Sequence, residues 1–430
     1  MKENNILIKN VKIISPEYSN EPIKSILICD GIIKQIADEI EQTDSCEIIN
    51  GDGLCISPSL VDVHVHFRDP GFEYKEDIIS GAKAAAKGGF TDVFTMPNTK
   101  PCCDNINVLN YVLNKSNVSK VKIHPIACIT KSMAGKELCD FEELAKNGAA
   151  GFSDDGKCVD DIFLMQKAAQ IANNLKLPII SHCEDMNIVK NGIMNNGRVS
   201  RAIGASGIDR KSEDNITQRE ILISRKFDVP IHIAHVSTSG AITALRRAKS
   251  IGVKVTCETA PHYFIFTETK LAKKDANFRM NPPLRERKDV LSMRKAIADG
   301  LIDCIATDHA PHSRDEKADF ENAPNGIIGL ETSFSASYTY LVKKDIISLK
   351  QLINLMSVNP AKIMNMPGWE NKKVCENCLA DLVIYNPNES WVVDEKNFVS
   401  KSSNSPFIGM ELDLKVKYTI KNGKITYCED

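Results

Sequence analysis

Residues 60–66 read Leu-Val-Asp-Val-His-Val-His, a short and largely apolar run that ends in two histidines. A run of this length, rich in β-branched residues, predicts a buried strand over residues 60–65. Side chains two positions apart on a strand point the same way, so His64 and His66 can approach one ion. Imidazole groups placed in this way suit zinc and related divalent metals.

Seven more short apolar runs follow along the chain and predict seven further strands. They span residues 91–96, 122–129, 149–153, 178–182, 230–235, 254–258 and 303–307. Helix-like stretches separate most of them, for example 78–87, 164–175 and 289–297. Eight alternations of strand and helix predict an α/β chain with a (β/α)8 TIM-type barrel. A doubly wound sheet is the competing architecture, but the sequence lacks the glycine-rich phosphate loop typical of one.

The two ends of the chain have a different pattern from the middle. Residues 1–56 are strand-and-turn sequence with a hairpin turn expected at Asp30-Gly31, and residues 377–430 return to that style. We therefore expect a small β-rich domain formed from both chain termini, flanking a barrel over residues 57–376.

The composition of the 430-residue chain limits the classes of function. With 43% apolar and 26% charged residues it resembles a soluble protein, and a net charge of −2 gives no reason to expect a nucleic-acid or membrane partner. The first residues are polar and no long apolar run follows, so we expect no signal peptide and a cytoplasmic location. Most of the 14 cysteines look like small buried hydrophobes, and the Cys375–Cys378 pair lacks the second pair that a zinc ribbon needs.

Residues that commonly bind metals gather at the ends of the predicted strands. They are His64, His66, Asp154 and Asp155, His182, His235 and Asp308. In a (β/α)8 barrel the carboxyl ends of all the strands meet on one rim, where the active site lies. A single histidine is more often structural, but four histidines with carboxylates on one rim predict a metal site. Strand parity does not decide between Asp154 and Asp155.

The other histidines have weaker patterns. His232 precedes the sixth-strand ligand by three positions and faces away from it, which indicates a structural or supporting role. For His124, His262 and His309, packing or hydrogen bonding is the better interpretation. His312 lies in the loop after the eighth strand, where a substrate contact and a solvent-exposed role are both open.

The motifs around these positions resemble those of dihydroorotases, in the bacterial class of the amidohydrolase superfamily that has an aspartate at the fourth-strand metal position. The first-strand signature is 63–71 (VHVHFRDPG), and the others are 96–99 (MPNT), 153–156 (SDDG), 181–184 (SHCE), 234–237 (AHVS), 280–285 (MNPPLR), 307–312 (TDHAPH) and, in the tail, 400–401 with 404–407. The likeness covers nearly the whole chain. It departs at Pro58-Ser59, where the family commonly has Pro-Gly, and in a slightly shorter loop around Asn325.

The resemblance implies a reaction and a set of residues. The reaction is the reversible, zinc-dependent cyclisation of N-carbamoyl-L-aspartate to (S)-dihydroorotate plus water, a step of pyrimidine biosynthesis. One or two Zn²⁺ ions per subunit, with two favoured, are implied at His64, His66, Asp155, His182, His235 and Asp308. Asp308 is also implied to carry the proton between nucleophile and ring nitrogen. The implied substrate contacts are Arg68, Asn98 and His312 for the carboxylate, and Asn281, Asn325 and Gly326 for the ring or its open form.

Alternatives to this reaction remain open. Hydantoinases, dihydropyrimidinases and allantoinases share the barrel and typically bridge two metals with a carboxylated lysine, whereas here the position is Asp155 with Lys157 nearby. Arg68 favours an acidic substrate, which hydantoin lacks, and a deaminase would leave the carboxylate-binding residues unexplained. A non-catalytic partner of aspartate transcarbamoylase would be expected to have lost metal ligands, which this chain keeps. Homodimer formation and association with aspartate transcarbamoylase are both left open by the sequence.

Overall fold

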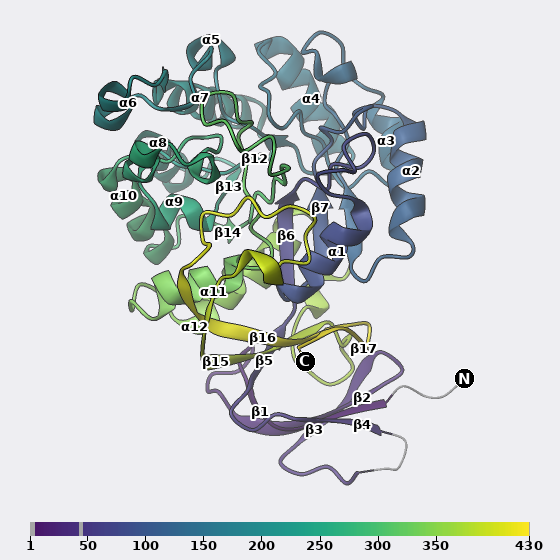
Figure 1. Ribbon diagram of the computed structural model, residues 1–430. Helices are drawn as coiled ribbons and strands as arrows, with labels where there is room; N and C mark the ends of the chain where they lie inside the picture. Colours follow the sequence, from purple (N-terminus) through teal and green to yellow (C-terminus); the bar gives the residue numbers. More distant parts are fainter. Residues whose placement is uncertain (1–4, 43–45, 430) are drawn as a thin grey trace.

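The computed structural model describes residues 5–42 and 46–429, in which a β-sheet lies beneath a larger body of strands and helices (Figure 1). The sheet has eight strands in the order β17-β16-β15-β5-β1-β2-β3, and β4 pairs with β1. Its strands are β1 (Asn5–Ile13), β2 (Ile23–Cys29), β3 (Ile32–Ala37), β4 (Cys46–Asn50), β5 (Cys55–Pro58), β15 (Leu382–Val392), β16 (Glu411–Lys421) and β17 (Lys424–Cys428). One sheet therefore contains strands from both ends of the chain.

Two tight turns in this sheet have backbone angles that few residue types adopt. Asp30 and Gly31 join β2 to β3 with φ values of 50° and 82°, and Asn422 and Gly423 join β16 to β17 with 48° and 69°. Two-residue hairpins with a type I′ turn need positive φ at both positions, which Asp-Gly and Asn-Gly tolerate. The hairpin turn predicted at Asp30-Gly31 is confirmed.

The larger body is built on parallel strands. β6 (Leu60–Val65), β7 (Phe90–Thr95) and β8 (Lys122–Pro125) form one sheet, and β9 (Ile180–Ser181), β12 (Ile231–Ile233), β13 (Val255–Thr259) and β14 (Cys304–Ile305) form another. Isolated parallel bridges link the two sheets through Phe152, which pairs with Ala127 on one side and Ile179 on the other. A further bridge joins His309 to Val65. Parallel neighbours can thus be followed from β6 through Phe152 to His309 and back to β6.

The strands of this body match the predicted runs in position, although several are shorter. β6 has the predicted bounds and all six of its residues are buried, as expected for a parallel strand covered on both faces. In the predicted run 149–153 only Phe152 forms a β-bridge. Its neighbours Ala150 and Gly151 have small side chains with low β propensity, which gives a short, irregular strand.

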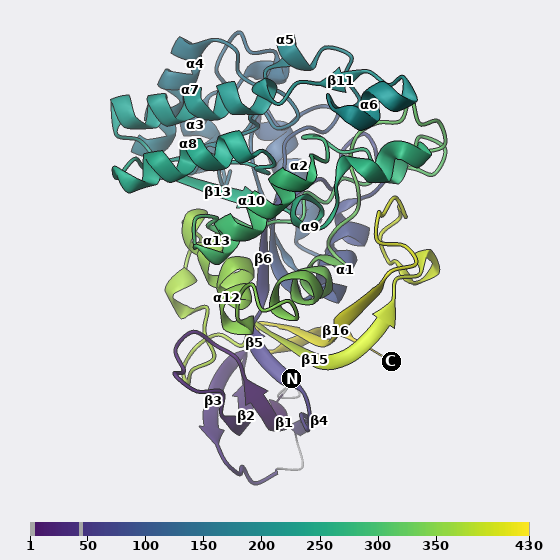
Figure 2. The ribbon, with the colours of Figure 1, turned by 90° about the vertical axis from the view of Figure 1, so that its left-hand side faces the viewer.

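Helices surround these strands (Figures 1 and 2). They are α1 (Ile78–Lys87), α2 (Ile106–Ser116), α3 (Phe141–Lys146), α4 (Ile162–Asn174), α5 (Met186–Val189), α6 (Arg198–Ile203), α7 (Lys211–Phe227), α8 (Ser239–Ser250), α9 (Pro261–Ile265), α10 (Arg287–Ala298), α11 (Ser333–Ser337), α12 (Leu349–Ile353) and α13 (Asn359–Ile363), with the short strands β10 (Met194–Asn195) and β11 (Gly207–Ile208) between α5 and α7. The carboxylate of Asp77 accepts hydrogen bonds from the first turn of α1, which ends at Lys87 as predicted and has Gly88 as its C-cap. No helix in the described part of the chain has the length and apolar character required to span a membrane.

Candidate metal centre

The residues predicted to bind metal converge on one carboxylate, Asp155. Its Oδ1 lies 3.3 Å from His64 Nε2 and 3.4 Å from His235 Nε2. The same oxygen lies 3.3 Å from His182 Nδ1, while Oδ2 lies 3.4 Å from His66 Nε2. These residues come from widely separated parts of the sequence. The four histidines lie at or just beyond strands of the parallel body, and Asp155 follows the isolated bridge at Phe152.

Asp308, just after β14, completes the cluster on the side of His66. Its Oδ1 lies 3.2 Å from His66 Nε2 and 3.7 Å from His64 Nε2. Two overlapping groups of potential ligands result, one of His64, His66 and Asp308 and one of His64, Asp155 and His235. His182 joins the second group, since its Nδ1 is 2.8 Å from His235 Nε2. The structure thus brings together all six predicted ligands.

The atoms that face one another in the cluster fit a divalent metal. Among the described residues, His64 Nε2 and Asp155 Oδ1 are buried and make no hydrogen bond. Leaving such groups without a partner away from water is costly, and a cation between them would satisfy both. Imidazole nitrogens mixed with carboxylate oxygens are the ligand set of zinc and similar ions.

Asp154 and Asp155 have different surroundings, which resolves the choice that strand parity left open. The Asp154 carboxylate accepts hydrogen bonds from the backbone N–H groups of Ile129 and Thr130, at 2.8 and 3.1 Å, and so holds the loop after β8. Asp155 alone of the two faces the histidines. Lys157 donates to the Met133 carbonyl at 3.2 Å and is not part of the cluster.

The surroundings of both cluster carboxylates favour the ionised form. Burial raises the pKa of Asp155, but His64 and the other neighbouring histidines outweigh burial and hold that pKa well below its usual range. Burial acts in the same direction on Asp308, but its contacts with His66 and the nearby histidines lower its pKa overall. Charged carboxylates are the form that binds cations.

Three of the histidines are oriented by hydrogen bonds on the side away from the cluster. His64 Nδ1 donates to Glu258 Oε1 at 2.6 Å and His182 Nε2 to Glu184 Oε2 at 3.1 Å. His66 Nδ1 donates to Asn98 Oδ1 at 2.8 Å. Such contacts fix the tautomer and direct the second nitrogen at the metal position. Glu184 and Glu258 were not predicted as partners of the ligands. The signal that could have identified them is an acidic residue at the end of a largely apolar run.

Three residues of the site have a left-handed backbone conformation. His235, Asp308 and Arg68 have φ values of 34°, 50° and 61°. Non-glycine residues adopt this region uncommonly, and the surrounding structure must hold them there.

Four of the predicted substrate-binding residues form a connected row beside the cluster. Arg68 Nη2 lies 3.2 Å from His312 Nε2, and His312 Nε2 donates to the Asn325 carbonyl at 2.9 Å. The side chain of Asn325 donates to Asn281 Oδ1 at 2.9 Å. Burial lowers the pKa of Arg68 to about 10, which still leaves the guanidinium charged near neutral pH. The row therefore presents one cation with neutral hydrogen-bonding groups.

The other two predicted substrate contacts, Asn98 and Gly326, have different neighbours. Asn98 Oδ1 accepts a hydrogen bond from the metal ligand His66 at 2.8 Å, whereas Gly326 lies next to Asn325 and His312 of the row. Gly326 has a φ of 134°, and a Cβ built there would come within 2.7 Å of the Ala310 Cβ and 3.1 Å of His312 Nε2. Only glycine fits this position without moving the loop.

The remaining histidines are all buried, and three of them contact groups that are not metal ligands. His124 pairs with Asp92 at 3.0 Å, and His309 Nδ1 accepts from the backbone N–H of Gly329 at 3.2 Å, consistent with packing and hydrogen-bonding roles. His262 is fully buried. His232 contacts Glu258, the partner of His64, at 3.2 Å.

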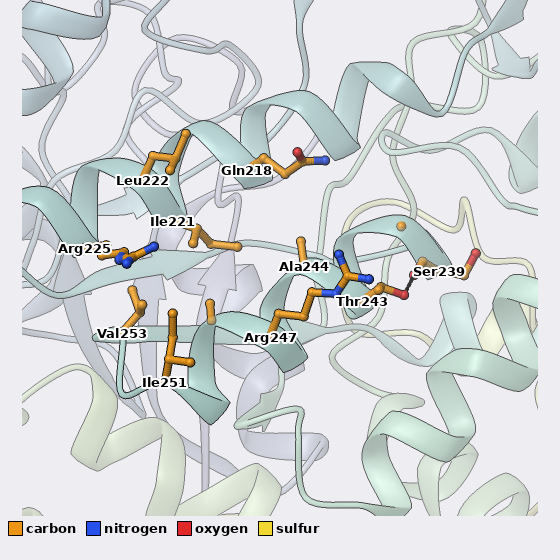
Figure 3. Close-up of a pocket in the computed structure, with 12 residues that line it drawn as sticks. Gln218, Ile221, Leu222, Arg225, Ser239, Thr243, Ala244, Arg247, Ile251 and Val253 are labelled. Atoms are coloured by element: carbon orange, nitrogen blue, oxygen red, sulfur yellow. Dashed lines mark hydrogen bonds between the residues drawn. The ribbon is translucent and has the colours of Figure 1, made fainter.

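Two hollows lie in the parallel-stranded body. One of about 510 Å³ is lined by Asn98 and by Asp155, the one predicted ligand that borders it. Another, of about 570 Å³, lies between α7 and α8 and is lined largely by apolar side chains together with Arg225 and Arg247 (Figure 3). No histidine, cysteine or carboxylate lines the second hollow, so it lacks the groups that the predicted chemistry needs.

Comparisons with known proteins identify relatives of this chain. The family model described as "Dihydro-orotase-like" matches residues 53–241. Proteins named dihydroorotase from Geobacter metallireducens and Acetivibrio thermocellus are 43% and 44% identical to this chain, over 98% and 99% of its length and 99% of their own. Among solved structures, the L-hydantoinase (dihydropyrimidinase) of Arthrobacter aurescens has a TM-score of 0.85 at 23% identity, covering 98% of this chain and 95% of its own. The dihydropyrimidinase of Brevibacillus agri has 0.83 at 20%, covering 98% and 94%. At such identities these two structures are similar in fold alone.

Proposed function

This chain belongs to the dihydroorotase family, and from that premise we propose that the cluster around Asp155 interconverts N-carbamoyl-L-aspartate and (S)-dihydroorotate. The observation that carries the proposal is the Asp155 carboxylate, with nitrogens of four histidines 3.3 to 3.4 Å from its oxygens. An aspartate in this place separates the site from one built on a carboxylated lysine, since Lys157 contacts the Met133 carbonyl instead. The reaction is the hydrolysis of a cyclic amide and its reversal.

Zinc is the proposed cofactor, with two ions per subunit. The proposed ligands are the six residues of the cluster, His64, His66, Asp155, His182, His235 and Asp308, whose two overlapping groups share His64 and would each hold one ion. When bound, Zn²⁺ lowers the pKa of water to about 7 and polarises a carbonyl group. The buried, unpartnered atoms of His64 and Asp155 support this assignment.

Asp308 is the proposed proton carrier. Its side chain is 10% exposed, against 5% or less for the other five ligands, so among them it is the most accessible to a substrate. Its lowered pKa keeps the carboxylate ready to accept a proton from the attacking nucleophile. The same oxygen would return that proton to the departing ring nitrogen, and ring closure would use these steps in reverse.

Arg68, Asn98 and His312 are the proposed contacts of the substrate carboxylate, and Asn281, Asn325 and Gly326 those of the ring or its open form. A buried guanidinium can make a planar two-point contact with a carboxylate. His312 donates to the Asn325 carbonyl, the Asn325 side chain donates to Asn281, and His312 also contacts Arg68; these contacts support a shared role in substrate binding. This arrangement favours an acidic cyclic amide over hydantoin or dihydrouracil.

For the architecture, we propose that the parallel pairings close into a (β/α)8 barrel over residues 57–376. Residues 1–56 and 377–430 would then form the composite β domain, which the shared sheet supports. The bridges of Phe152 and of His309 with Val65 support closure. A cytoplasmic location, a homodimer and an association with aspartate transcarbamoylase stay predictions, as does the expectation of no nucleic-acid or membrane partner.

The test is turnover of dihydroorotate beside hydantoin, dihydrouracil and allantoin, on purified protein whose bound metal is quantified. We expect turnover of dihydroorotate alone, lost on chelation and restored by zinc. Activity on hydantoin or dihydrouracil instead would contradict the role of Arg68. Bound metal with no turnover of any of the four would contradict the proposed substrate.

A further inference from the structure

Glu258 is a buried carboxylate on β13 that lies behind the metal ligands and is not needed to hold substrate. Its Oε1 accepts a hydrogen bond from His64 Nδ1 at 2.6 Å and faces the backbone N–H of His235 at 3.4 Å. Its Oε2 accepts from His232 Nε2 at 3.2 Å. One side chain therefore connects β13 with β6 and with the end of β12.

The orientation of this carboxylate is fixed from its far side. The Thr256 hydroxyl lies 2.8 Å from His232 Nδ1. If the hydroxyl donates to Nδ1, the ring proton is on Nε2, where it is donated to Glu258. Thr256 and Glu258 are two positions apart on β13, so their side chains leave the strand on the same face. A row of Thr256, His232 and Glu258 thus ends at His64.

The row of Thr256, His232 and Glu258 contacts the ligand that is shared by both metal-binding groups, His64. His64 belongs to both groups of potential metal ligands, whereas His66 and His235 each belong to one. Glu184, the comparable partner of His182, contacts a single ligand. Glu258 touches His64 through its side chain and His235 through its backbone, so its influence reaches both groups.

His232, Glu258 and Cys304 also have donor atoms within 4.8 Å of one another, which raises the question of a third cation site. Both Glu258 oxygens and His232 Nε2 already make hydrogen bonds. Cys304 is fully buried in the apolar core, where a thiolate is disfavoured. The trio is better explained as support for His64.

We propose that Glu258 is a positioning residue that sets the metal affinity of the whole cluster through His64, and that Thr256 and His232 hold its carboxylate in place. By taking the Nδ1 proton, Glu258 keeps His64 Nε2 free of a proton and aimed at Asp155, 3.3 Å away. A hydrogen-bonded carboxylate also makes the imidazole a stronger ligand. The inference rests on the proposed metal-dependent function.

The experiment measures zinc binding by competition with a chelator in the full-length wild-type protein and in Glu258→Gln, with Glu184→Gln as the matched control. Loss of such a partner typically weakens metal binding about 10- to 100-fold. In Glu258→Gln we expect that weakening at every equivalent that the wild type binds, with a changed visible spectrum of the cobalt-substituted protein. In Glu184→Gln we expect weakening at one equivalent only.

Wild-type zinc affinity in Glu258→Gln, or weakening confined to one of two equivalents, would overturn the proposal. Thermal unfolding of the metal-free proteins checks that the variants fold. Should Glu258→Gln fail to fold, Thr256→Val is the second variant. We expect it to weaken zinc binding at the same equivalents, but by less. Unchanged zinc affinity in Thr256→Val would count against the role of the row. A wild-type protein that binds no zinc would instead contradict the proposed function, whatever the variants do.

Discussion

Replacing Asp308 by asparagine separates its proposed proton transfer from its role as a ligand. Asparagine has nearly the same shape and keeps an oxygen where Asp308 Oδ1 lies, 3.2 Å from His66 Nε2 and 3.7 Å from His64 Nε2. The other five ligands are unchanged, so we expect the fold and much of the metal to remain. An amide cannot carry the proton, and general acid–base catalysis typically contributes about 10²- to 10⁴-fold. The expected loss in kcat corresponds to about 3 to 5 kcal/mol in the barrier.

The assay is steady-state hydrolysis of dihydroorotate by zinc-loaded Asp308→Asn, with zinc measured in the same samples. Asp315→Asn is the control, because this exposed carboxylate lies in the same loop and outside the cluster. We expect the control to keep wild-type kcat. Wild-type kcat in Asp308→Asn would refute the proton-carrier role. A loss of activity that tracks the loss of zinc would reduce Asp308 to a metal ligand.

Three further predictions concern substrate recognition and stability. Arg68→Met removes a charged hydrogen-bond partner worth about 1.5 to 3 kcal/mol. The value of kcat/KM for dihydroorotate should therefore fall about 10- to 100-fold. An unchanged kcat/KM would show that the guanidinium does not bind substrate. Gly326→Ala forces a Cβ to within 2.7 Å of the Ala310 Cβ, and strain of about 1 to 3 kcal/mol should raise KM while zinc content stays constant. Asp77→Ala removes the cap of α1 and should lower the free energy of unfolding by about 1 kcal/mol in denaturant titrations near neutral pH. Burial raises the pKa of Asp77, but hydrogen bonds with Lys401 and with the first turn of the helix outweigh burial and lower that pKa to about 2. The stabilisation by the cap should therefore be fully present above the unfolded-state pKa of about 4 and be lost as the pH falls through about 2. A difference in the free energy of unfolding between wild type and variant that does not shrink in acid would contradict this.

Much of the fold was predictable because its signals are local. The run 60–65 became β6 and the alanine-rich run 78–87 became α1 with the predicted bounds. Strand lengths were less predictable, because a strand ends where its pairing ends. β8 stops at Pro125 rather than at residue 129, and its continuation bonds instead to the segment around Phe152. Pairing partners of this kind lie far apart in the sequence.

The sequence by itself determined which residue types stand at the strand ends, because strand periodicity and chain order place His64, His66, His182, His235 and Asp308 without knowledge of distant contacts. Local sequence patterns did not decide whether Asp154 or Asp155 is the metal ligand. The tertiary structure separates them, since one carboxylate holds the loop after β8 and the other faces the four histidines.

Only the tertiary structure identified the groups behind the ligands. Glu258 and His64 are 194 positions apart, and their 2.6 Å contact depends on strands β6 and β13 both facing the interior of the same body. No periodicity encodes such a contact, because hydrogen bonds between distant elements depend on how those elements pack. The chemistry of the site can be predicted from residue type and spacing, whereas its tautomers, charges and fine positioning are decided by packing.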